Sequence, residues 1–163
     1  MIGNDIVDLA LAKIESNWLR NGFLDKIFTQ KEQLLIANAI NPEIMIWNLW
    51  TRKEAAYKIY NRKTGLRGYI PLKLECFYES DTIGTVVCNG FKYYTQTQIS
   101  NESIYTIAVV EKKYFNRIRK ISLETKITKI ESVPFTVDEV TLLSHPVSIT
   151  HHGCFWEGIT IVH

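Results

Sequence analysis

The amino-acid sequence predicts a single α+β domain over residues 1–163, in which an antiparallel sheet packs against one long helix. Helix-capping signals cluster before residue 66, whereas segments rich in Val, Ile, Thr, Tyr and Phe dominate from residue 69 onward. Asn89-Gly90 lies between two such segments, and this dipeptide is the strongest short-range signal for a hairpin. A length of 163 residues is typical of one domain, and no internal repeat or linker divides the chain.

The N-terminal segment, residues 1–9, is predicted to form a short strand. Its alternation places Asp5 on one face together with Gly3, Val7 and Leu9. A carboxylate among apolar neighbours is costly unless it is paired. We therefore expect another part of the chain to supply a partner for Asp5.

A capping box predicts the first of two well-marked helices. Thr29 and Glu32 stand three residues apart, just before an apolar pair, so that their side chains can satisfy unpaired amides reciprocally. This pattern predicts a helix over residues 30–40.

The second helix is predicted from residue 42 to about Arg62. Asn41 supplies its N-cap, Pro42 suits the first helical position, and Gly65 marks its end. We expect this helix to pack on the sheet, with Ile46, Leu49 and Ala56 among its contacts.

The rest of the chain is predicted to be mostly β. Strand candidates are residues 69–77, 84–98, 103–110, 147–150 and 158–162. The stretch 111–145 is interpreted as mixed, with a polar helical part and then an interruption at Pro134.

Composition and charge restrict the function classes. A hydrophobic content of 46% and a charged content of 22% match ordinary soluble proteins. No segment approaches the roughly 18 apolar residues of a membrane span, and the N-terminus lacks the regions of a signal peptide, so we expect a cytoplasmic protein without a membrane partner.

A net charge of +2 gives no reason to expect a nucleic-acid partner. One local basic run is interpreted as a solvated helix face, with docking of an acidic partner as the alternative: Lys112, Lys113, Arg117, Arg119 and Lys120. An odd number of cysteines without CxxC spacing supports neither a disulfide framework nor a zinc site: Cys76, Cys88 and Cys154.

The long helix carries the first candidate chemistry. Three- and four-residue steps place six polar and aromatic residues on one face: Trp47, Trp50, Glu54, Tyr57, Lys58 and Asn61. Glu54 and Lys58 by themselves read as a surface ion pair, but two tryptophans on the same face are unusual for a solvated surface. The face therefore suggests a cleft.

Asp5 and Glu54 together suggest a divalent-cation site. Two carboxylates from different elements can hold Mg²⁺ and leave positions for water and substrate phosphates. Asp8 would be a third ligand if the chain turned helical after Asp5, and Lys58 would neutralise phosphate charge. Near the C-terminus, Thr150 and His151 either grip phosphate or form a polar turn.

Four segments resemble one family in order along the chain. Residues 3–9 read Gly-Asn-Asp-Ile-Val-Asp-Leu and resemble the opening Gly-x-Asp-Ile-Val-Glu/Asp-Leu of holo-acyl-carrier-protein synthases, members of the 4′-phosphopantetheinyl transferase superfamily. Residues 23–29 with Glu32 are similar to the next family stretch. Residues 50–58, Trp-Thr-Arg-Lys-Glu-Ala-Ala-Tyr-Lys, are similar to the most specific motif, Trp-x-x-Lys-Glu-Ala-x-x-Lys. Residues 147–151 are similar to the Ser-x-Ser/Thr-His element.

The resemblance implies the family's fold and a Mg²⁺-dependent enzyme. Such an enzyme moves the 4′-phosphopantetheine arm of coenzyme A to a serine of an apo acyl or peptidyl carrier protein and releases 3′,5′-adenosine bisphosphate. By resemblance, Asp5 and Glu54 bind the metal, and Glu54 or a metal-bound water takes the serine proton. Lys58, assisted by Lys53, contacts the phosphates of coenzyme A. The nucleotide's phosphates would also be held by Thr150 and His151, with Ser148 as a further candidate.

The sequence also departs from the family pattern. Asn4 replaces an aliphatic residue, and Val7 stands where long members have a second acid. Residues 59–65 replace a glycine-rich turn, which leaves three substitutes for phosphate binding: Arg62, Lys63 and Thr64. Short members form trimers with sites between subunits, so the resemblance suggests a homotrimer, unless residues 66–112, a longer β insertion than short members need, make one chain self-sufficient.

Two other functions stay open from the sequence. The chain could be an inactive module of the same fold that binds a carrier protein or coenzyme A, or it could be a Mg²⁺-dependent phosphohydrolase.

Overall fold

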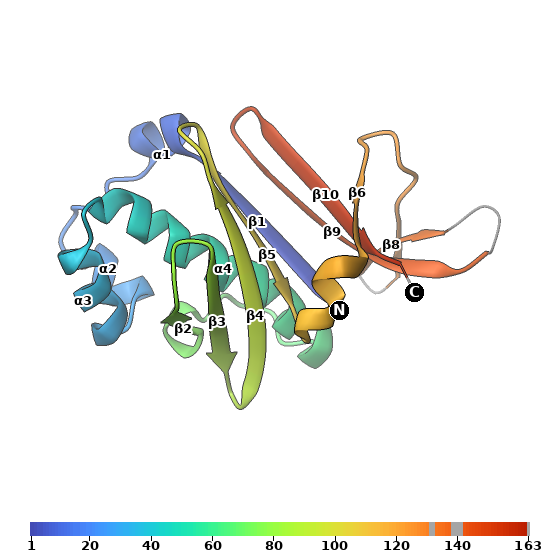
Figure 1. Cartoon of the computed structure of the whole chain (residues 1–163), viewed down its shortest axis with the longest axis horizontal. Coiled ribbons are helices and arrows are strands. Elements are labelled where there is room, and N and C mark those ends of the chain that lie inside the picture. The colour runs from blue at the N-terminus through green and yellow to red at the C-terminus, as the bar shows by residue number, and fades with distance from the viewer. Residues whose placement is uncertain (131–132, 138–141, 163) are drawn as a thin grey trace.

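The computed structural model describes residues 1–130, 133–137 and 142–162 (Figure 1). Its helices are α1 (Leu9–Glu15), α2 (Phe23–Ile27), α3 (Gln30–Asn38) and α4 (Pro42–Thr64), with 3₁₀ turns η1 (Pro71–Lys73) and η2 (Lys112–Arg117). The strands are β1 (Ile2–Asp8), β2 (Glu75–Tyr78), β3 (Ile83–Cys88), β4 (Phe91–Ile99), β5 (Ser103–Val109), β6 (Ile118–Ile121), β7 (Thr128–Ile130), β8 (Val133–Val137), β9 (Ser144–His152) and β10 (Phe155–Ile161).

The strands form two antiparallel sheets. The first has the order β1-β5-β4-β3-β2, and the second has the order β6-β10-β9-β8-β7. Figure 1 shows α4 lying across one face of the first sheet and the second sheet standing beside β1. The predicted α+β fold, with an antiparallel sheet packed against a long helix, is confirmed.

The capping signals place α3 and α4 where the sequence predicts them. Thr29 and Glu32 form the reciprocal capping box of α3. The Asn41 side chain accepts a hydrogen bond from the Ile44 backbone N–H, and Gly65 closes α4 in a left-handed conformation. Three side chains expected to face the sheet are fully buried in the larger of the two hydrophobic cores: Ile46, Leu49 and Ala56.

Gly3 lets β1 approach α4 closely. A Cβ atom at this position would lie 2.0 Å from the backbone oxygen of Ala55, a distance that no side chain can occupy. The Gly at the start of the opening motif therefore sets the separation between the strand that carries Asp5 and the helix that carries Glu54 and Lys58.

The predicted hairpin at Asn89-Gly90 joins β3 to β4. Both residues have positive φ, 48° and 81°, as a type I′ turn requires. The expected strand over 69–77 is shorter than predicted, because Pro71 begins the turn η1 and β2 starts only at Glu75.

The stretch 111–145 is mixed, as expected, but the helical part of its described residues is only one short 3₁₀ turn, and Pro134 lies in a strand instead of interrupting one. Its basic run forms the short turn η2 and then β6, and Lys113 and Lys120 are each in an ion pair, with Glu111 and Glu157. Pro134 lies within β8, opposite Lys129 of β7. Positions 131–132, 138–141 and 163, which belong to the predicted domain, lie outside the described residues.

The second sheet meets β1 through side chains. The backbone N–H of Asn4 donates to Ser148 Oγ over 3.1 Å, and the backbone N–H of Asp8 donates to His152 Nδ1 over 2.8 Å. The buried Asn4 side chain donates through Nδ2 to the Glu157 carbonyl oxygen over 3.0 Å. We call this boundary between β1 and β9 the seam.

Two further properties concern the described part of the chain. Its three cysteines are free thiols: Cys76 and Cys88, which are buried, and Cys154, which is exposed. None of its helices combines the length and the apolar character needed to cross a bilayer.

Candidate active site at the seam

Three of the predicted site residues meet at the seam. Asp5 Oδ1 accepts hydrogen bonds from Lys58 Nζ over 3.3 Å and from Thr150 Oγ1 over 3.0 Å. Lys58 Nζ also donates to the Asn4 carbonyl oxygen over 2.6 Å and to the Ile149 carbonyl oxygen over 3.3 Å. The partner expected for Asp5 is therefore Lys58. The Lys58 ammonium group donates hydrogen bonds to β1 of the first sheet and to β9 of the second.

Glu54 lies one helical turn before Lys58, and its environment disfavours its charge. Burial, and then the negative charge of Asp5, raise the pKa of Glu54 to about 7, although Lys58 acts in the opposite direction. Burial also raises the pKa of Asp5, an effect that Lys58 and the Thr150 hydroxyl partly offset. The two carboxylates thus repel each other in a partly desolvated place, and Lys58 does not fully neutralise them.

This charge imbalance fits a bound Mg²⁺. Magnesium commonly takes one or two protein carboxylates and completes its shell with waters and substrate phosphates. Within the residues described, no group of three or more His, Cys, Asp or Glu side chains could hold a metal ion, so protein ligands at this place would be the two carboxylates alone. Asp5 and Glu54 suit a metal that arrives with a phosphate ligand.

Asp8 has a structural task instead of joining this pair. Its Oδ1 caps α1 by accepting from the backbone N–H groups of Ala10 and Leu11, and its Oδ2 accepts from the Cys154 backbone N–H. These bonds lower the pKa of Asp8, led by the one from Leu11. Both oxygens of Asp8 are therefore occupied by backbone N–H groups, and Asp8 does not serve as the third metal ligand that the sequence left open.

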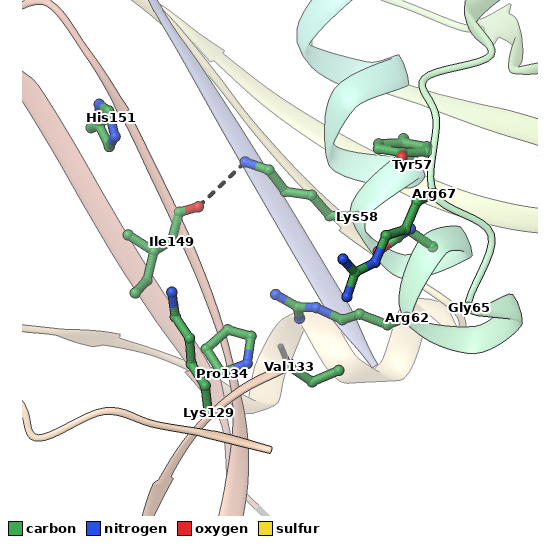
Figure 2. A pocket seen from close by; sticks show the side chains of 11 residues that line it. Tyr57, Lys58, Arg62, Gly65, Arg67, Lys129, Val133, Pro134, Ile149 and His151 are labelled. Atoms are coloured by element: carbon green, nitrogen blue, oxygen red, sulfur yellow. Dashed lines mark hydrogen bonds between the residues drawn. The ribbon is translucent and has the colours of Figure 1, made fainter. Parts of the chain in front are cut away.

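A pocket of about 540 Å³ adjoins the seam (Figure 2). One wall comes from α4 and the residues after it, and the other comes from the second sheet. The cationic and imidazole side chains that line it are Lys58, Arg62, Arg67, Lys129 and His151, and no carboxylate is among its described lining residues. Such a pocket favours an anionic ligand, and Lys58 connects it directly to Asp5.

The three residues predicted to replace the glycine-rich turn in phosphate binding lie in different surroundings. Arg62 lines the pocket and donates to the Ile2 carbonyl oxygen over 3.0 Å, and burial lowers its pKa to about 10. Lys63 instead lies over the Phe91 ring, 4.2 Å from its centroid. Thr64 donates to the Tyr60 carbonyl oxygen inside the helix. Of the three, only Arg62 faces the pocket.

The structure does not bring Lys53 to the site. Its fully buried ammonium pairs with the buried carboxylate of Glu32 over 2.7 Å and donates to the Ile27 and Pro71 carbonyl oxygens. Lys53 and Glu54 are neighbours in a helix, so they point in different directions. The expected assistance of Lys53 in phosphate binding is replaced by a structural role.

The residues of the C-terminal element, 147–151, lie in two places, some beside β1 and others at the pocket. Thr150 is buried against Asp5, whereas His151 is exposed and lines the pocket. Ser148 is fully buried as the acceptor for Asn4, so it does not reach the pocket. Side chains alternate along β9, so Ser148 and Thr150 point to one face of the strand and His151 points to the other.

Two of the cationic residues that line the pocket are missing from the sequence-based prediction. Arg67 follows the end of α4, and the C-cap at Gly65, which turns the chain back, is the signal that would have directed attention to it. Lys129 lies on β7, in a stretch without any motif, so only the pairing of the second sheet places it in the pocket.

Comparison with known proteins gives one family and one fold. The family model described as the 4′-phosphopantetheinyl transferase superfamily matches residues 1–110. No curated protein matches the chain. Among solved structures, the chain is similar to the Helicobacter pylori holo-[acyl-carrier-protein] synthase in complex with coenzyme A, with 16% identity and a TM-score of 0.54 over 67% of this chain and 98% of that one.

The chain is also similar to the holo-[acyl-carrier-protein] synthase of Neisseria meningitidis, with 18% identity and a TM-score of 0.51 over 68% of this chain and 97% of that one. At these identities the likeness is one of fold. Both neighbours are covered almost completely, while about a third of this chain has no counterpart in them.

Proposed function

The chain belongs to the 4′-phosphopantetheinyl transferase superfamily, and on this basis we propose that it transfers the 4′-phosphopantetheine arm of coenzyme A to a serine of an apo carrier protein. The reaction would depend on Mg²⁺ and release 3′,5′-adenosine bisphosphate. One observation supports the proposal most: Lys58 joins a repelling carboxylate pair to an anion pocket, so that a metal site and a phosphate site share one cation.

The basic pocket would take the phosphates of coenzyme A. Lys58 is the cation nearest the carboxylates, so it would meet the pyrophosphate, the group that reacts. The fixed positive charge of Lys58 and Arg62 would stabilise negative charge as it grows on the departing adenosine bisphosphate. Thr150 would hold Asp5 in place, and His151 would border the nucleotide.

Asp5 and Glu54 would hold the metal. When bound, Mg²⁺ supplies positive charge that neutralises the pyrophosphate and relieves the repulsion between the two carboxylates. The raised pKa values of both groups support this assignment, because each carboxylate lacks sufficient compensating charge in the protein alone.

The transfer itself exchanges one phosphorus–oxygen bond for another. The serine hydroxyl oxygen attacks the phosphorus that bears the pantetheine arm, and the bond from that phosphorus to the adenosine bisphosphate breaks. We assign the serine proton to Glu54, because a carboxylate beside the reacting phosphate is placed to act as a general base.

The test is a mass measurement on apo carrier proteins incubated with coenzyme A and the enzyme, with and without Mg²⁺. We expect one added phosphopantetheine group, only with Mg²⁺, on at least one member of a panel of fatty-acid, polyketide and peptide-synthetase carriers. Adenosine bisphosphate released without any carrier would indicate a phosphohydrolase. Binding of coenzyme A with no modification of any carrier would indicate an inactive module.

A further inference from the structure

The far wall of the pocket comes from the part of the chain that the family model does not match. The match ends at residue 110, whereas Lys129 lies on β7, Val133 and Pro134 on β8, and Ile149 and His151 on β9. These strands belong to the second sheet, which the seam holds against β1. The second sheet therefore builds half of the pocket from the same chain.

The cations of the pocket occupy two walls. Lys58 is held at the seam by Asp5, while Arg62 is anchored by the Ile2 carbonyl oxygen on the α4 side. Figure 2 shows Lys129 across the pocket from Arg62 and Arg67. A ligand between these walls meets positive charge from both sides, and it meets Lys58 only at the end next to the carboxylates.

Coenzyme A carries two kinds of phosphate that match this division. The pyrophosphate must reach Lys58, because the reacting phosphorus has to lie beside Asp5 and Glu54. The other phosphate is a monoester at the adenosine end, and a phosphomonoester carries about −1.5 to −2 charges at neutral pH. Cations of the pocket that are remote from Asp5 are placed to bind it.

We infer that Lys129 binds the terminal phosphomonoester of coenzyme A from the second sheet, opposite Arg62 and Arg67, and so makes the pocket selective for coenzyme A over its dephosphorylated form. This inference rests on the proposed function for the identity of the ligand. Lysine suits the role, since its ammonium is a compact point charge on a flexible stem that can follow a phosphate.

The test compares two ligands on variants of the full chain by calorimetry in the presence of Mg²⁺. Wild-type protein should bind coenzyme A more tightly than dephospho-coenzyme A by about 10-fold or more, the scale of a charge-assisted hydrogen bond. Lys129→Gln should reduce that preference to less than about 3-fold by weakening coenzyme A binding alone. Lys129→Arg should retain most of it.

Lys126→Gln is the matched control, because Lys126 is an exposed lysine shortly before β7 that does not line this pocket. It should leave both affinities unchanged. The inference is overturned if the wild-type protein does not distinguish the two ligands, or if Lys129→Gln keeps the full preference while circular dichroism shows it folded.

Binding and transfer are measured separately, so the two proposals can fail separately. A chain that selects coenzyme A through Lys129 but modifies no carrier would refute the transfer and leave the phosphate contact established. A chain that modifies carriers equally well from both donors would refute the phosphate contact and leave the transfer intact.

Discussion

Charge at Asp5 and Glu54 controls both stability and the proposed turnover. The two carboxylates come from a strand and a helix that Gly3 allows to lie close together, and Lys58 is the cation hydrogen-bonded to Asp5. Their raised pKa values have the same origin, which is burial with too little opposite charge. Removing either charge should therefore harm catalysis without harming the fold.

Asp5→Asn and Glu54→Gln should each lower kcat/KM by about 100-fold or more, the scale for losing a preorganised charge-stabilising group. The double variant should lose far less than the product of the two, because the carboxylates act as one unit. Steady-state kinetics across Mg²⁺ concentrations measure this. An Asp5→Asn enzyme with near-normal turnover and unchanged Mg²⁺ dependence would refute the metal assignment.

Asp8→Asn is the control for that experiment. It should cost clearly less in turnover, because Asp8 caps α1 rather than facing the carboxylate pair. Asn keeps one acceptor oxygen for capping but loses the acceptor for the Cys154 N–H, so thermal stability should fall moderately, and it should fall further in Asp8→Ala, which loses both acceptors.

Glu54 also predicts how stability depends on pH without metal. Between pH 4.5 and about 7 the unfolded chain releases the proton of Glu54 while the folded chain keeps it. The free energy of unfolding should therefore fall through this window: the contribution is fully present below pH 4.5 and lost above about 7. Denaturant unfolding in EDTA should show that Glu54→Gln reduces this decline to the part that Asp5 contributes, so the variant is the more stable protein at pH 8. Parallel curves for the two proteins would contradict the raised pKa.

At the scale of elements, α4 is fixed by contacts on several sides. Gly3 sets its distance from β1, Lys53 and Glu32 tie it to α3, and Arg52 ties it to the β2–β3 connection through the Ser80 and Asp81 carbonyl oxygens. These contacts position Glu54 and Lys58 without touching a substrate. Lys53, a defined position of the specific motif, thus serves to place the helix.

Gly3→Ala should destabilise the protein by about 2 kcal/mol or more, because its Cβ would clash with backbone that no rotamer change can move. Thermal unfolding would detect the change. Gly22 offers the comparison: an added Cβ there meets nothing within 4 Å, so Gly22→Ala should cost only the strain of its positive φ. Equal losses at the two positions would show that the approach of β1 to α4 is not tight.

Breaking the buried pair by Lys53→Met or Glu32→Gln should cost about 3–5 kcal/mol, because one charge would stay buried without its partner. Replacing both by apolar residues of similar size should cost much less. The pair of exposed Lys31 and half-buried Glu75 is the matched control, and Lys31→Ala should cost less than about 1 kcal/mol. If Lys53→Met kept wild-type stability and lost coenzyme A affinity, the phosphate contact expected from the sequence would be restored.

At the scale of the whole molecule, one chain brings together the carboxylate pair, Lys58 and both walls of the pocket. Of the two oligomeric expectations, this arrangement favours a self-sufficient chain over a homotrimer with sites between subunits. Specific activity should then be constant on dilution, and light scattering should show active monomers. Activity that falls steeply on dilution, together with a trimer in light scattering, would show that the site needs a second copy.

The sequence alone determined the features that depend on local chemistry. Capping at Thr29, Asn41 and Gly65 fixes helix ends, because unpaired backbone groups must find nearby partners. The turn at Asn89-Gly90 follows from the positive φ that these residues tolerate. Asp5 was predicted to need a partner because it is a charge on an otherwise apolar face, and Lys58 was predicted as a site residue from the polar and aromatic face of the long helix.

Only the tertiary structure decided which charges share a site. Lys53 and Lys58 look equivalent in the motif, but helical geometry sends the first into the core with Glu32 and the second to the seam with Asp5. Lys129 carries no sequence signal at all, since its place in the pocket depends on the pairing of β7 with β8 and of β8 with β9. Long-range contacts of this kind depend on the register of distant strands and on the packing of one sheet beside another, and neither is written in a local pattern.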